Sequence, residues 1–167
     1  TCTETWRSLG YELDATLQCA VASDLANNLV DAFRKNWFAA PTWFKVGLGY
    51  WYSRRTDERF TVYATGTTRD LGDDSWKWEP RIRGLVLNKA HPAWKDMLAW
   101  QTPKDLVTHE HMVVWSRVDW MLAQKGADLR AFLLGITDSV QRVPEAKRPM
   151  LLLERQQKAL QAGFGKS

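Results

Sequence analysis

The chain has three histidines, His91, His109 and His111, and imidazole is a common zinc ligand in proteins. None of them has a second histidine four residues away, the spacing that places two ligands on one face of a helix. His109-Glu110-His111 could hold a metal only in an extended or loop conformation, because residues i and i+2 do not share a helix face. We therefore favour the interpretation that they are polar residues at the start of a helix.

Two cysteines, Cys2 and Cys19, allow one disulfide or two free thiols. They cannot build a four-thiolate zinc site or a disulfide framework. The sequence also offers no Ser/His/Asp or Cys/His arrangement with any specificity. We expect structural cysteines, no catalytic nucleophile and no cofactor.

Ten tryptophans distinguish the composition, and most lie in apolar helical segments where packing in the core is the better account. Trp76 and Trp78 differ, because they lie in a polar stretch rich in Gly and Asp. Together with Arg81 and Arg83 they could form a stacking surface for a glycan or a polyanion. These four residues are the candidate binding residues.

A net charge of +4 and a pI near 9.2 would suit a polyanionic partner. However, Lys and Arg are scattered, and the one dense basic group, residues 54–59, contains its own acids. We predict that this group is a solvated turn, and we do not expect nucleic acid as a partner.

The longest predicted helix spans residues 12–35, a stretch without Pro or Gly. Apolar residues recur in it every four positions, at Leu17, Val21, Leu25, Leu29 and Phe33. The opposite face is small and uncharged, with Thr16, Ala20, Ser23, Asn27 and Val30. We expect this helix to be covered on both sides.

A second predicted helix begins after Pro41 and runs to about residue 52. Its only charge before Arg54 is Lys45, so we expect it in the interior. Gly47 and Gly49 each cost about 1 kcal/mol relative to Ala within a helix. That cost is explained if another backbone must approach closely there.

The sequence as a whole predicts a mostly α fold in a single domain over residues 1–167. No run of residues is long and apolar enough to cross a bilayer, and no export signal opens the chain. Because it begins at Thr1, we expect a processed product or a piece of a longer protein, with export slightly favoured. Further elements are expected as a short strand at 60–64, a turn-rich stretch at 66–80, a segment at 91–100, a helix start at 102–105, and helices at 110–124, 128–136 and 150–162.

The phrase Pro41-Thr42-Trp43-Phe44-Lys45-Val46-Gly47-Leu48-Gly49-Tyr50-Trp51 resembles one found in gluzincin-type zinc metallopeptidases of the peptidase-MA-like group, especially bacterial members of unknown function. In that family a helix with H-E-x-x-H precedes P-x-W-x-x-E-G-L-A-x-Y by about twenty residues. Weaker likeness extends to residues 111–118, 132–133 and 162–165, and so covers most of the chain. The resemblance implies a helical lobe of a metallopeptidase-like fold.

Laid on this sequence, the family pattern places Ser23 and Asn27 at the two His positions, Asp24 at the general base and Val46 at the Glu ligand. A hydroxyl and an amide are poor zinc donors, and Val is none. Without a metal to lower the pKa of a bound water, Asp24 has nothing to activate. We expect residues 23, 27 and 46 to converge on one spot without a metal.

Our leading hypothesis is therefore a catalytically inactive, metallopeptidase-like domain that serves as a structural or protein-interaction component. Family members normally carry a small sheet upstream of the metal helix, and this chain begins too close to that helix to supply one. We expect either the missing part of a precursor or another protein chain as its partner. The alternatives are the polyanion or glycan binding module above, and an enzyme whose site the sequence does not reveal.

Overall fold

The computed structural model describes residues 14–32, 40–60, 74, 76–123, 126–137 and 148–164, without the side chains of 14–16, 126–127, 137 and 148–151. Within these ranges the fold is all helical, which confirms the mostly α prediction. The helices are α2 (Asp14–Ala32), α3 (Thr42–Thr56), α4 (Trp78–Leu87), α5 (Trp94–Ala99), α6 (Thr108–Ala123), α7 (Gly126–Thr137) and α8 (Arg148–Phe164), with a 3-10 turn η2 at Pro103–Asp105. None of them is long and apolar enough to span a bilayer.

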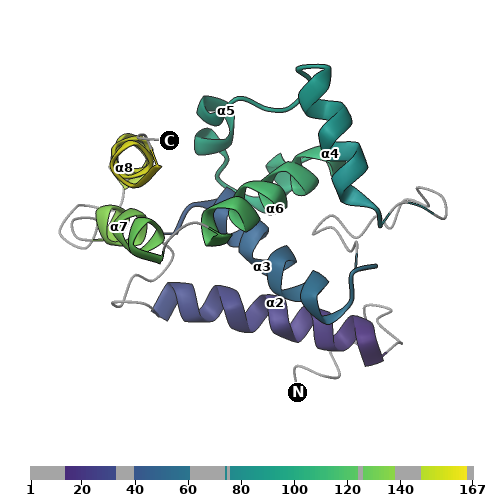
Figure 1. Cartoon of the computed structure of the whole chain (residues 1–167). Coiled ribbons are helices and arrows are strands. Elements are labelled where there is room, and N and C mark those ends of the chain that lie inside the picture. The colour runs from purple at the N-terminus through teal and green to yellow at the C-terminus, as the bar shows by residue number, and fades with distance from the viewer. Residues whose placement is uncertain are drawn as a thin grey trace.

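Helix α3 is the centre of the molecule and lies between α2 and α6 (Figure 1). Helix α4 packs against α6, α5 against α8, and α7 pairs with α8. The main core joins the helices at Trp43, Phe44, Val114 and Phe132, all almost fully buried. As predicted, α3 is an interior helix.

Both helix glycines are sites of close approach, although the predicted approach of another backbone is found only at Gly47, whereas side chains approach Gly49. A Cβ atom at Gly47 would lie 2.5 Å from the carbonyl oxygen of Val114 on α6. A Cβ atom at Gly49 would lie 2.4 Å from Oγ of Ser23 on α2. The two glycines therefore let α3 contact a neighbouring helix on each side.

The expectation that α2 is covered on both sides is wrong among the described residues. Its small and polar face packs on α3, whereas Val21, Leu25 and Leu29 are 52%, 57% and 63% exposed. Small side chains let the two helices approach closely, and Ser53 and Lys45 of α3 make polar contacts to this face of α2. The apolar stripe is left on the outside.

The predicted solvated turn at 54–59 is also wrong at its start. Arg54 lies in the last turn of α3 and is only 8% exposed. Its guanidinium carbon lies 4.1 Å from the ring centre of Trp78 and 5.1 Å from that of Trp115. It donates hydrogen bonds to the backbone oxygens of Phe60 and Trp76, so the charge is well satisfied.

The other predicted helices agree with the observed ones to within a few residues at each end, but helix α4 was not predicted. Helix α4 begins at Trp78, inside the stretch predicted to be irregular. In the predicted strand 60–64 only Phe60 is described, and it is not in a strand. The other four positions lie outside the described residues.

Candidate functional site

The two positions matched to zinc-binding histidines face a glycine on the next helix. Ser23 and Asn27 lie one turn apart on α2, and both approach Gly49 of α3. Oδ1 of Asn27 is buried and has no hydrogen-bond partner within the described part of the chain. The two side chains therefore fill the closest contact between α2 and α3.

Polar contacts between α2 and α3 lie on both sides of this spot along the helices. At one end, the Ser53 hydroxyl donates to the carbonyl oxygen of Cys19 (2.7 Å), and the Cys19 thiol donates to the carbonyl oxygen of Ser53 (3.3 Å). At the other end, Lys45 pairs with Asp31 at 2.5 Å. Cys19 is a free thiol, and burial raises its pKa, with the nearby Asp57 adding to the rise. It is therefore a packing residue and a weak nucleophile.

The remaining two motif positions, Asp24 and Val46, are not among the nearest neighbours of this contact. Asp24 is exposed on α2, where partial desolvation raises the pKa of its carboxyl group. Val46 lies one turn before Gly49 on α3 and packs against the main core and against a smaller apolar cluster of Tyr50, Trp78 and Met112.

This arrangement does not suit zinc. A hydroxyl, an amide and an aliphatic side chain stand at the ligand positions, and Oγ of Ser23 is pressed against the α3 backbone. In the part of the chain that the structure describes, no three His, Cys, Asp or Glu side chains are grouped as metal ligands.

The His109-Glu110-His111 sequence lies in the first turn of α6, as predicted. The Glu110 carboxylate accepts a hydrogen bond from the backbone nitrogen of Val107 (2.7 Å) and so caps the helix. His111 is 1% exposed and packs edge-on against Tyr50, with ring centres 5.6 Å apart. Burial lowers the pKa of His111 to about 4, so it is neutral at physiological pH.

The four candidate binding residues do not gather at one place. Trp78 is fully buried beneath Arg54, so neither face of its ring is open to a ligand. Trp76 is half-buried and lines a cavity at the end of α3. Arg81 lines a separate cavity between α4 and α6, and Arg83 is exposed.

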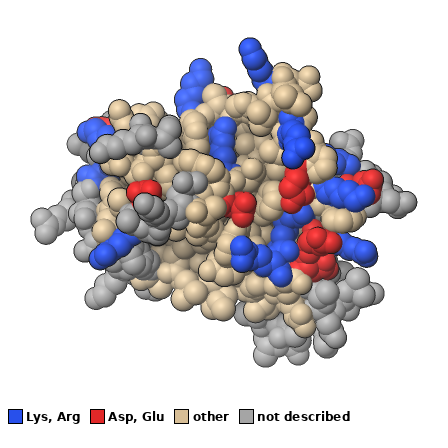
Figure 2. All heavy atoms as spheres, in the orientation of Figure 1, with Lys and Arg blue, Asp and Glu red and all other residues tan. Residues whose placement is uncertain are grey.

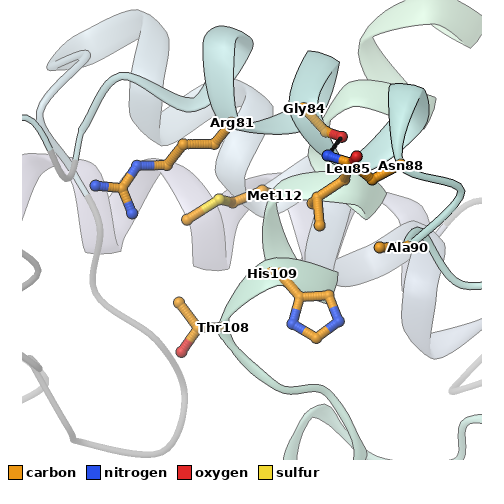
Figure 3. Close-up of a pocket in the computed structure, with 8 residues that line it drawn as sticks. All are labelled: Arg81, Gly84, Leu85, Asn88, Ala90, Thr108, His109 and Met112. Atoms are coloured by element: carbon orange, nitrogen blue, oxygen red, sulfur yellow. Dashed lines mark hydrogen bonds between the residues drawn. The ribbon is translucent and has the colours of Figure 1, made fainter.

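The cavity between α4 and α6 has a volume of about 410 Å³. Figure 3 shows Leu85 and Met112 in its middle, with Arg81 and His109 on opposite sides. The two polar groups therefore do not converge on one atom of a bound molecule.

A third cavity, of about 520 Å³, lies beside α5, α6 and α8. Trp94 and Trp120 line it and are 37% and 40% exposed, so neither is fully buried in the core as Trp43 is. Arg117 lies over the Trp94 ring at 4.3 Å and donates to the carbonyl oxygen of Pro92. Burial lowers the pKa of Arg117 to about 10, which leaves it charged.

The cavity at the end of α3 is the most polar of the three, and sequence reasoning missed most of it. Its wall includes Trp51 and Arg55 on α3, and Trp115 and Asp119 on α6. Each pair is four residues apart on one helix, and that spacing of an aromatic and a charged residue was a signal that could have located it.

No protein-family model, curated protein or solved structure matches this chain. The likeness to gluzincin-type peptidases therefore rests on the phrase at residues 41–51 and on the positions matched to it on α2.

Proposed function

We propose that this chain is a catalytically inactive, metallopeptidase-like domain that acts as a protein-interaction component. The sequence phrase at residues 41–51 supports the metallopeptidase-like scaffold. The substitutions at Ser23, Asn27 and Val46 support its inactivity, because these side chains lack the donors that would hold a catalytic zinc ion. The contact of Ser23 with Gly49 adds to this, since it fills the space between the helices.

The observation that carries the interaction role is the outer stripe of α2, formed by Val21, Leu25 and Leu29. Each is more than half exposed, although large aliphatic residues spaced one helical turn apart usually face a core. Covering what remains exposed of the three would contribute about 3 kcal/mol to association.

The charge of α2 indicates what kind of partner fits the stripe. The helix contains Asp14, Asp24 and Asp31 and no Lys or Arg, in a chain whose net charge is +4. Asp31 is neutralised by Lys45, and Asp24 is exposed beside the stripe. The partner is therefore a helix on another protein chain with an apolar stripe flanked by Lys or Arg.

A direct test uses a fluorescent synthetic helix with a leucine stripe and lysine flanks as the probe, titrated with the full chain. The double variant L25Q/L29Q should weaken binding at least tenfold, and D24N should weaken it less while reducing its salt dependence.

The matched control is V86Q/L87Q on α4, which removes two apolar residues that are 54% and 77% exposed. It should leave the affinity unchanged. Equal losses in the two double variants, or no loss in either, would contradict docking on α2. Sedimentation of the chain alone separates a partner from self-association: a dimer abolished by L25Q/L29Q would mean that a second copy covers the stripe.

A further inference from the structure

The cavity at the C-terminal end of α3 combines aromatic rings with acceptor groups in a small volume. It measures about 200 Å³ and is lined by three indoles, Trp51, Trp76 and Trp115, and by three carboxylates, Glu58, Glu79 and Asp119. We propose that it binds one pyranose unit of a neutral glycan. Sugar rings present C–H faces that pack on indoles and hydroxyl groups that donate to carboxylates, so they match both kinds of lining.

The wall of this cavity is held in place before any ligand arrives. Arg54 is fixed by two backbone carbonyl oxygens, one of which belongs to Trp76 (2.8 Å). Nε1 of Trp51 donates to Asp119 at 2.9 Å, which joins α3 to α6 across the site. Trp115 packs edge-on against the buried Trp78, with ring centres 5.6 Å apart. A preorganised wall lowers the entropy cost of binding.

The charges around the cavity argue against a polyanion. Its lining has two arginines, Arg54 and Arg55, and three carboxylates. The arginines are engaged, Arg54 as above and Arg55 over the Trp51 ring at 3.8 Å. No hydrogen bond or ion pair inside the described ranges engages Glu58 or Glu79. Figure 2 shows acidic and basic side chains mixed over the end of α3 and the start of α4, without a field of one sign.

A small organic cation also fits less well than a sugar. The guanidinium groups of Arg55 and Arg54 already lie over Trp51 and Trp115. Lys77 and Arg59 lie 5.4 Å and 6.0 Å from the centre of the Trp76 ring. A further cation would meet like charges at each indole, whereas a neutral polyol can hydrogen-bond to groups of both signs.

The test uses the full chain labelled with 5-fluorotryptophan and followed by fluorine NMR. The probes are cellohexaose, chitohexaose and mannohexaose, with heparin and tetramethylammonium chloride as the charged comparisons. At least one neutral hexasaccharide should shift the resonances of Trp51, Trp76 and Trp115 and leave that of the buried Trp43 in place.

Two variants then test the assigned groups. W76A should weaken the binding of that hexasaccharide at least tenfold, and E79Q should weaken it severalfold. W76A retains the backbone carbonyl that holds Arg54, so we expect this variant to fold. Thermal unfolding checks that it does. W120A removes a tryptophan exposed beside another cavity and should leave the affinity unchanged.

The inference is overturned if none of the three hexasaccharides shifts the three resonances. It is equally overturned if W120A weakens binding as much as W76A, or if heparin or tetramethylammonium binds more tightly at Trp76 than any of the neutral probes.

Discussion

The contact between Ser23 and Gly49 gives a quantitative prediction. In G49A the new Cβ atom would lie 2.4 Å from Oγ of Ser23, well inside ordinary contact distance. Relief requires rotation of the hydroxyl or a small separation of the helices, at a cost of about 1 to 2 kcal/mol. Alanine gains about 1 kcal/mol over glycine within a helix. G49A alone should therefore change the free energy of unfolding by less than about 1 kcal/mol.

Removal of the Ser23 hydroxyl makes G49A stabilising. In the S23A background the nearest atoms to the new Cβ are Nδ2 of Asn27 at 3.4 Å and Cβ of residue 23 at 3.5 Å, which are ordinary contacts. G49A should then stabilise the protein by up to about 1 kcal/mol.

Urea unfolding of the wild type, S23A, G49A and the double variant measures the coupling between the two sites. We expect a coupling of about 1 to 2 kcal/mol. A value below about 0.5 kcal/mol, the usual range for independent sites, would refute the placement of Ser23 against Gly49.

Three further predictions follow from the same core. G47A should destabilise the protein by about 2 kcal/mol or more, because its Cβ would meet the carbonyl oxygen of Val114, which cannot rotate away. K45M should lower the free energy of unfolding, measured in urea, by about 1 to 2 kcal/mol, because it leaves the largely buried Asp31 carboxylate without its partner. His111 has a pKa of about 4 when folded against about 6.5 when unfolded, so protonation favours the unfolded chain. The stability that neutral His111 contributes is full above about pH 6.5 and is lost as the pH falls towards 4, which amounts to about 2 to 3 kcal/mol.

Each of these has a clear contrary result. G47A with wild-type stability would mean that α3 and α6 do not approach at this glycine. A neutral K45M would mean that the ion pair contributes nothing to the α2 interface. For His111, the control is H111F, which should show a smaller loss of stability on acidification than the wild type; an equal loss would place the titrating groups elsewhere.

The helices and the close contacts of α3 could be predicted from the sequence because their causes are local. Residues 42–52 have almost no charge, and two glycines within a helix needed a steric explanation, which Val114 and Ser23 provide. The orientation of α2 could not be predicted in the same way. Its leucine stripe suggested a buried face, but the small face fits α3 more closely, and that fit depends on Gly49 and Ser53 in another helix.

The candidate sites show the same limit. Trp78 lies in a polar stretch of sequence, and it is buried by packing with Arg54, Tyr50 and Trp115, which are distant in the chain. Trp76 is predicted as a binding residue and does line a cavity, but its neighbours there, Trp51 and Trp115, come from α3 and α6, which are distant in the sequence. Composition indicated which side chains could act, whereas only the packing of α3, α4 and α6 shows which of them meet.

The proposed inactivity of this scaffold requires that the spot where Ser23 and Asn27 meet α3 is a packing contact rather than a metal site. Elemental analysis of the purified full chain after dialysis against zinc at low micromolar concentration tests this most directly. We predict a zinc content far below one ion per chain, unchanged in the S23A variant. One zinc ion per chain, lost in S23A, would contradict the account.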